Sequence, residues 1–211
     1  SAALVAGFDQ SIPGVQVNRF CASGLEACAI AAGKAASGEA ELVVGGGVEM
    51  MSRVPMLSSG MPPLSDPGFA LPHKSVPQGV SADFIATLKG YSRDDVDTLA
   101  VESQKRASAA WSDGRFGKSI VPVEDRNGLT ILDHDEAIRA SADMQSLGAL
   151  TPSFEGYAKK LGFDAVATRK YPEIREMRFV HHAGNSSQIV DGAAAVLLGT
   201  AKAASRHGLR P

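Results

Sequence analysis

Hydrophobic and polar positions alternate near the N-terminus and then take on a helical period. Two valines alternate with polar neighbours after a Pro-Gly turn, which predicts a short strand over residues 14–19. Leu and Ala then recur at helical spacing over residues 22–37, ahead of a stop signal at Gly38. The apolar run 42–44 predicts a buried strand that leads into three glycines. This strand-helix-strand order indicates an α/β layer.

The next segment is rich in proline. Six prolines fall within residues 53–78, and such a stretch is expected to form neither regular helix nor central strand. A disordered linker and an ordered covering loop both fit this composition, and apolar residues that could be buried favour the covering loop. Those residues are Met56, Leu57, Met61, Leu64, Phe69 and Leu71.

The remaining pattern predicts a mixture of helices and strands. Ser92 is a typical N-cap for a helix near residues 93–111. The apolar face expected for that helix comprises Val96, Leu99, Ala100, Ser103, Ala107 and Ala110. Further elements are expected as a strand in 119–125, a helix near 141–147, a strand at 194–198 and a helix at 201–207.

Composition narrows the class of protein. The chain has 211 residues, 44% hydrophobic and 21% charged, which suits a soluble globular protein of one or two domains. A net charge of −2 suggests neither nucleic acid nor an anionic membrane as a partner, and no apolar run approaches the ~20 residues of a membrane span. With two cysteines and no recognisable secretory signal, a cytoplasmic location is expected.

The two cysteines lie seven residues apart, on one face of the predicted helix. Their Cα atoms would be about 10 Å apart there, whereas a disulfide needs less than about 7 Å. A metal site needs more ligands than this face supplies, and no Cys-x-x-Cys or His-x-x-x-His pair accompanies it. We therefore expect no disulfide and no metal, with Cys28 in the core.

Cys21 stands where the predicted strand ends and the helix begins, before three small residues. A helix N-terminus presents free N–H groups and a partial positive charge, which favour the reactive thiolate form of a cysteine. The same N–H groups could stabilise an oxyanion on an attacked carbonyl. From these residues alone, a nucleophile and a buried structural cysteine both remain open.

Two longer motifs decide between them. VNRFCASGLEA is followed by AELVVGGGVEMMS, and HHAGNSSQIVDGAAAVL comes later in the chain. Together they resemble the thiolases, which transfer acyl groups to and from coenzyme A, and the resemblance covers nearly the whole chain except an insertion-like piece at 157–177. It implies that Cys21 is the catalytic nucleophile and carries the acyl group as a thioester. It also implies an α/β, thiolase-like layered fold (α/β/α), here incomplete.

The second motif contains the expected substrate-binding residues. Ala183, Gly184, Ser186 and Ser187 are small or polar and leave room for a ligand to approach the backbone. The resemblance implies that they bind coenzyme A and that Ser187 hydrogen-bonds its pantetheine arm. Without the resemblance, an ordinary Asn/Ser/Gly turn would be the preferred interpretation.

Two other features are interpreted as structural. His181 and His182 are adjacent, and neighbouring residues on a strand point in opposite directions, so we expect no shared metal. Gly45–Gly47 is not followed by Lys-Ser/Thr, so it is not a phosphate-binding loop. It is expected to allow close backbone packing beside the nucleophile helix.

The resemblance implies an enzyme that transfers acyl groups between 3-oxoacyl-CoA and coenzyme A, by thiolytic cleavage or the reverse condensation, in fatty acid or lipid metabolism. Coenzyme A is a substrate, and no cofactor is expected. The partners expected are acyl-CoA, coenzyme A and further copies of the chain in a homodimer or homotetramer. In family terms, residues 1–52 belong to the N-terminal half with the nucleophile, 53–120 to a loop and covering region, and 121–211 to the end of that half and the start of the C-terminal half.

The chain also departs from the family pattern. The Asn-Glu-Ala-Phe, Gly-His-Pro and Cys-x-Gly motifs of thiolases do not occur in it, so we expect a fragment that is inactive alone. PQGVSAD (77–83) replaces the usual His-Met-Gly-x-Thr-Ala-Glu, and HHAGN replaces Thr-Ala-Gly-Asn, which favours a 3-oxoacyl-CoA bulkier than acetoacetyl-CoA. A non-catalytic acyl-CoA-binding or scaffold relative is the main alternative. A ketosynthase-type condensing enzyme is a third, which GGVEMMS and AGNSS argue against.

Overall fold

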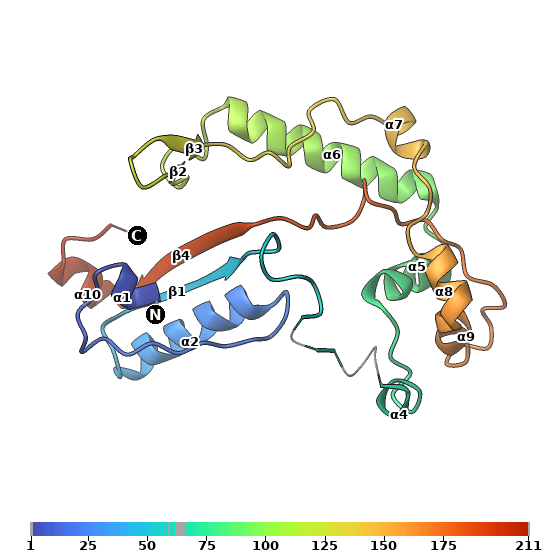
Figure 1. Ribbon diagram of the computed structural model, residues 1–211, viewed down its shortest axis with the longest axis horizontal. Coiled ribbons are helices and arrows are strands. Elements are labelled where there is room, and N and C mark those ends of the chain that lie inside the picture. Colours follow the sequence, from blue (N-terminus) through green and yellow to red (C-terminus); the bar gives the residue numbers. More distant parts are fainter. Residues whose placement is uncertain (1, 59, 62–65, 211) are drawn as a thin grey trace. The chain divides into compact units, whose positions relative to one another are not determined.

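A computed structural model describes residues 2–58, 60–61 and 66–210 (Figure 1). The chain forms two compact units. Unit 1 comprises the residues up to Met56 together with those from Ile189 onward, and unit 2 comprises Leu57–Gln188. This division follows contacts within the chain, whereas the segments 1–52, 53–120 and 121–211 refer to the halves of a thiolase and stay a prediction.

Unit 1 is a helix packed on a two-stranded sheet. β1 (Leu42–Glu49) pairs antiparallel with β4 (Gly192–Gly199), in a register that runs from Leu42 opposite Gly199 to Glu49 opposite Gly192. α2 (Ser23–Ser37) lies along the sheet (Figure 1). Two short helices complete the unit, α1 (Ala2–Val5) and α10 (Ala201–Arg206). The elements predicted at 22–37, 42–44, 194–198 and 201–207 are confirmed, and both strands are longer than their apolar runs.

Local sequence explains where α2 ends and which side it buries. Gly38 follows the helix with φ 78°, a left-handed conformation that glycine adopts without steric cost. Ala31 and Ala35, one turn apart, are buried. The strand predicted over residues 14–19 is wrong. Among the described residues this segment has only an isolated bridge between Arg19 and Cys21, and a strand needs the backbone of a neighbour to pair with.

Unit 2 is largely helical. α6 (Arg93–Ser112) begins at Ser92, whose side chain forms a reciprocal capping box with Asp95. The expected apolar face of this helix is partly wrong, because Leu99 is 71% exposed whereas Asp97 and Val101 are buried. The other elements are α4 (Pro67–Ala70), α5 (Gln78–Lys89), β2 (Val123–Glu124), β3 (Thr130–Leu132), α7 (Met144–Gly148), α8 (Glu155–Leu161) and α9 (Phe163–Thr168).

The proline-rich segment is more regular than predicted. Asp66 accepts a hydrogen bond from the amide of Gly68 and so caps the single turn of α4, and Pro77 directly precedes α5. The expectation that its apolar side chains are buried is wrong for Met56, Leu57, Phe69 and Leu71, which are all exposed. The part of this interpretation that rests on Pro62, Pro63 and Leu64 lies outside the described residues.

The core of unit 2 instead forms between α5 and the insertion-like piece. Val80 and Phe84 of α5 pack with Ala158 and Met177, and partly buried side chains surround them. These are Val76, Phe154, Phe163, Ala167, Tyr171, Ile174 and Phe179. The segment that departs from the thiolase pattern is therefore the one that covers α5.

The predicted strand in 119–125 and the predicted helix near 141–147 are present but shorter than expected. The strand expected within 119–125 is the two-residue β2, which pairs antiparallel with β3, and the helix expected near 141–147 is the five-residue α7. Asp143 caps α7 by accepting a hydrogen bond from the amide of Ser146. No helix in the described ranges has the length and apolar character needed to cross a membrane.

Candidate active site

Cys21 is an exposed residue on the turn that precedes α2. Phe20, directly before it, has φ 50°, a left-handed conformation that is uncommon for a residue with a side chain. Ala22 occupies the N-cap position, and its methyl side chain cannot accept hydrogen bonds from the first-turn amides. Cys21 is thus an exposed residue directly before the N-cap of α2, the end of the helix where free backbone N–H groups carry a partial positive charge.

The hydroxyl of Ser23 stabilises this turn. Its Oγ accepts a hydrogen bond from the backbone amide of Arg19 at 2.8 Å and donates one to the carbonyl of Phe20 at 2.6 Å. An ion pair between the side chains of Arg19 and Glu26 joins the same segment to the first turns of α2. Since that pair is substantially exposed, we assign most of the local restraint to Ser23.

The triple glycine brings β1 against α2, as predicted. A Cβ at Gly45 would lie 3.0 Å from the Cα of Cys28, closer than nearly all real contacts. A Cβ at Gly46 would lie 2.5 Å from the carbonyl oxygen of Ala194 on the neighbouring strand. The backbone of β1 lies so close to α2 and β4 that a side chain would not fit at Gly45 or Gly46. The backbone of Cys28 makes this contact, and the residue is partly buried, less than the core position expected of it.

The two motifs of the resemblance meet in unit 1. The amide and hydroxyl of Ser52, at the end of the first motif, both donate to the carboxylate of Asp191 in the second. The hydroxyl bond from Ser52, followed by its amide bond, lowers the pKa of Asp191 below the ordinary value. Asp191 is therefore a charged link between the segments that follow β1 and precede β4.

The residues expected to bind coenzyme A lie together on one turn of unit 2. Ala183 and Ser187 are exposed, whereas Gly184 and Ser186 are half-buried. The turn is closed by a hydrogen bond from the amide of Asn185 to the carbonyl of His182 at 3.1 Å. Cys21 belongs to unit 1, so the two parts of the expected site lie in different units.

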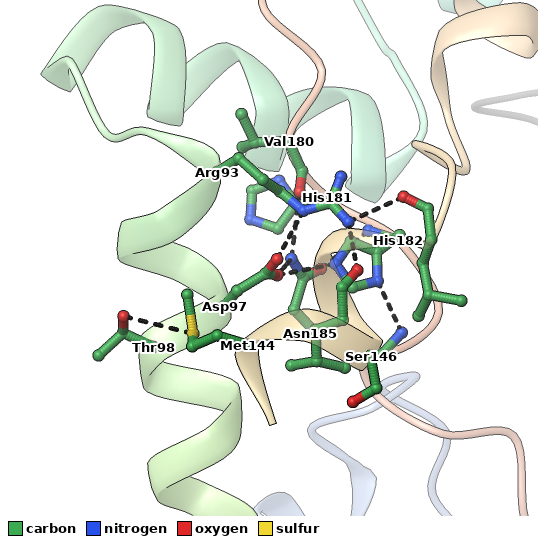
Figure 2. Close-up of polar contacts among 12 residues, drawn as sticks. Arg93, Asp97, Thr98, Met144, Ser146, Val180, His181, His182 and Asn185 are labelled. Carbon is green, nitrogen blue, oxygen red and sulfur yellow. Dashed lines mark hydrogen bonds and ion pairs between the residues drawn. The ribbon is translucent and has the colours of Figure 1, made fainter. Parts of the chain in front are cut away.

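Asn185 of this turn joins a polar cluster, here called the Asp97 network, in which Asp97 and His182 are buried and Arg93 and Asn185 are half-buried (Figure 2). Burial raises the pKa of Asp97, but the hydrogen bonds from Arg93, His182 and Asn185 together outweigh it and lower the pKa below the ordinary value. The carboxylate is therefore charged at neutral pH, with donors around it in place of water.

The adjacent histidines lie outside any strand and contact two different carboxylates. His182 Nε2 lies 2.7 Å from Asp97 Oδ1, and His181 Nδ1 lies 2.8 Å from Asp83 Oδ1. That oxygen of Asp83 also accepts hydrogen bonds from the amides of Val180 and His181. Each histidine thus links its segment to a separate helix.

Sequence reasoning missed Arg93, Asp83 and Asp97. One signal was present, since Asp97 lies in helical register with Arg93 one turn before it and Val101 one turn after it. A carboxylate on the face that also carries an aliphatic residue indicates a buried charge with a partner. The partners from the later motif could not be identified from spacing.

Comparison with known proteins agrees with these motifs. The family model for the thiolase N-terminal domain matches residues 1–160. The chain is 38% identical to β-ketoadipyl-CoA thiolase of Pseudomonas putida, covering 100% of this chain and 52% of that protein. It is 33% identical to 3-ketoacyl-CoA thiolase of Bacillus subtilis, covering 98% and 50% respectively. The crystal structure of the dimeric peroxisomal thiolase of Saccharomyces cerevisiae matches with a TM-score of 0.77 at 30% identity, over 99% of this chain and 49% of that one.

The chain therefore belongs to the thiolase family. Its fold is the expected thiolase-like arrangement of helices and sheet, and it covers about half of the complete thiolase fold. The chain likewise spans about half the length of the curated relatives that it matches.

Proposed function

We propose that this chain is the part of a thiolase-type acyltransferase that carries the nucleophile, Cys21. The observation that supports this most is the exposed thiol on a left-handed turn at the start of α2. Membership of the family and the names of the relatives favour an acyltransferase over a non-catalytic scaffold or a ketosynthase.

The proposed reaction is cleavage of a 3-oxoacyl-CoA. The thiolate of Cys21 attacks the 3-keto carbon, and the bond between C2 and C3 breaks with its electron pair going to C2. The resulting enolate takes up a proton and leaves as acetyl-CoA, while the shortened acyl group remains on sulfur as a thioester. The thiol of a second coenzyme A then attacks this thioester, loses its proton and regenerates Cys21. The reverse sequence is a condensation.

Coenzyme A is proposed as a substrate that the turn 183–187 binds, with Ser187 donating to or accepting from the pantetheine arm. The exposure of Ser187 and the small neighbours Ala183 and Gly184 support this assignment. The chemistry involves only acyl and proton transfer, so it requires no cofactor.

The substrate class proposed is a 3-oxoacyl-CoA longer than acetoacetyl-CoA. The names of the two bacterial relatives contain 3-ketoacyl-CoA and β-ketoadipyl-CoA. PQGVSAD at 77–83 differs from the usual thiolase sequence there. The test compares the rate of Cys21 acylation with three substrates, which ranks them by preference. These are acetoacetyl-CoA, a medium-chain 3-oxoacyl-CoA and β-ketoadipyl-CoA.

The test is mass spectrometry of the chain after incubation with a 3-oxoacyl-CoA, with thiolysis assayed in parallel. We expect one acyl group per chain, on the peptide that contains Cys21. Cys28→Ser should retain the adduct and Cys21→Ser should lose it. Coenzyme A binding without any adduct in the wild type would instead support the non-catalytic alternative.

A homodimer or homotetramer in the cytoplasm completes the proposal. The yeast thiolase that the chain resembles is described as dimeric. Light scattering of the purified protein measures the assembly directly, and a monomer at micromolar concentration would contradict this part.

A further inference from the structure

His182 is fully buried between α6 and its own turn. Its Nε2 lies 2.7 Å from Oδ1 of Asp97, and its Nδ1 lies 3.0 Å from the backbone amide nitrogen of Gly184. Both ring nitrogens therefore have a partner, one on a helix far away in the sequence and one two residues ahead.

These two partners determine where the proton of the ring resides. A backbone amide can only donate, so Nδ1 must be the unprotonated acceptor of the Gly184 N–H. Nε2 then carries the hydrogen and donates it to the carboxylate of Asp97. The neutral Nε2–H tautomer satisfies both contacts, whereas a proton on Nδ1 would point at another N–H group.

The same network restrains the rest of the turn. The side-chain oxygen of Asn185 accepts from the amide of His182 at 2.8 Å, and its Nδ2 donates to Asp97 Oδ1 at 2.8 Å. Arg93 donates through Nε to Oδ2 of Asp97 at 2.7 Å. The Asp97 carboxylate is thus the common acceptor that links the turn to α6 (Figure 2).

Other contacts prevent this acceptor from moving. The Nη2 of Arg93 donates to the carbonyls of Leu147 and Leu150, at 2.6 and 2.8 Å, so the guanidinium is anchored beyond α6. A Cβ at Gly184 would lie 2.5 Å from the side chain of Leu147 and 3.0 Å from Cε1 of His182. A side chain at position 184 would therefore require these neighbours to move.

We propose that His182 is a positioning residue for the turn 183–187. Through its Nε2–H tautomer it bonds both Asp97 and the Gly184 amide, and so sets the backbone that presents Ser187. This inference rests on the proposed function in that the turn binds coenzyme A. The imidazole has two ring nitrogens on opposite sides, which lets one side chain bond both Asp97 and the Gly184 amide.

Two substitutions separate the contact of His182 with Asp97 from its contact with the Gly184 amide. In His182→Asn the amide oxygen occupies nearly the place of Nδ1 and can accept from Gly184, but the side chain is too short to reach Asp97. In His182→Gln the longer side chain can donate to Asp97 from nearly the place of Nε2, but it lacks the acceptor near Gly184. His73→Gln, an exposed histidine of the same unit, is the control.

The experiment is NMR of the full chain with ¹⁵N-labelled histidine, together with hydrogen exchange of the Gly184 amide. We expect a hydrogen on Nε2 and none on Nδ1 of His182 at neutral pH. Gly184 exchange should accelerate on the order of tenfold in His182→Gln, and much less in His182→Asn. A hydrogen on Nδ1, or equal acceleration in both variants, would overturn the proposal. The spectrum of the wild-type histidine ring tests the position of the hydrogen on His182 even if a variant does not fold.

Titration with coenzyme A distinguishes this inference from the proposed function. If the wild type binds coenzyme A, His182→Gln should weaken binding several-fold and His73→Gln should leave it unchanged. Equal binding by wild type and His182→Gln would overturn the positioning role. No binding by the wild type, with the tautomer and exchange as expected, would refute the function assigned to the turn and still support its positioning by His182.

Discussion

Ser52 and Asp191 lie 139 residues apart in the sequence and are joined by two hydrogen bonds. The backbone amide of Ser52 donates to Oδ1 of Asp191 at 2.9 Å, and the hydroxyl of Ser52 donates to Oδ2. This pair connects the segment after β1 to the segment before β4, so it joins the two family motifs next to the sheet on which α2 packs.

Asp191→Asn should lower the melting temperature at neutral pH, because a neutral amide with one oxygen replaces a carboxylate that accepts two bonds. The folded-state pKa of Asp191 is below its ordinary value, so this stabilisation is present above the ordinary range and is lost as the pH falls through the lowered pKa. The difference between wild type and variant should therefore shrink in acid. Thermal melts at several pH values measure it, and a difference that grows in acid would contradict the assignment.

Iodoacetamide at neutral pH should alkylate Cys21 well before Cys28. Cys21 is exposed, whereas Cys28 is partly buried, with its backbone against Gly45. Peptide mapping after short labelling times measures the two rates in one sample. Cys28 labelled first in the folded chain would mean that the turn does not expose the Cys21 thiol.

Ser23→Ala should slow acylation of Cys21, since the turn loses both hydrogen bonds of the Ser23 hydroxyl. The cost in unfolding free energy should be about 1 kcal/mol, the usual effect of removing such a side chain at a helix start. Ser37→Ala is the matched control, because the Ser37 hydroxyl donates to the carbonyl of Lys34 at the other end of α2. Urea unfolding and acyl-adduct formation are measured on both variants, and equal acylation rates would count against a role for Ser23.

Gly45→Ala and Gly33→Ala should change stability in opposite directions. A methyl group at Gly45 meets the Cα of Cys28 at 3.0 Å and the carbonyl oxygen of Ala27 at 3.2 Å, so β1 must move from α2 at a cost of about 1–3 kcal/mol. At Gly33, within α2, nothing lies within 4 Å of the added Cβ, and alanine should stabilise the helix by up to about 1 kcal/mol. Chemical denaturation of the two variants measures the sign of each change in unfolding free energy. A neutral Gly45→Ala would show that the close packing is not required.

The sequence alone determined the local elements and the candidate nucleophile. The helix beginning after Cys21 and ending at Gly38 follows from helical spacing and a glycine stop, both properties of neighbouring residues. Neighbouring residues also predict that Cys21 stands at the start of that helix. They predict that the triple glycine allows close backbone packing, and the two sequence motifs indicate the family. The structure of residues 14–19 could not be predicted, because a strand depends on a partner that its own pattern does not specify.

Only the tertiary structure decided which distant residues act together. The antiparallel pairing of β1 with β4, the bonds between Ser52 and Asp191 and the network around Asp97 each join segments many residues apart. The burial of Asp97 beside an exposed Leu99 depends on what lies against α6, which periodicity within the helix cannot reveal. The proton position on His182 likewise follows from two contacts that exist only once the chain has folded, because a ring nitrogen becomes donor or acceptor according to its neighbour.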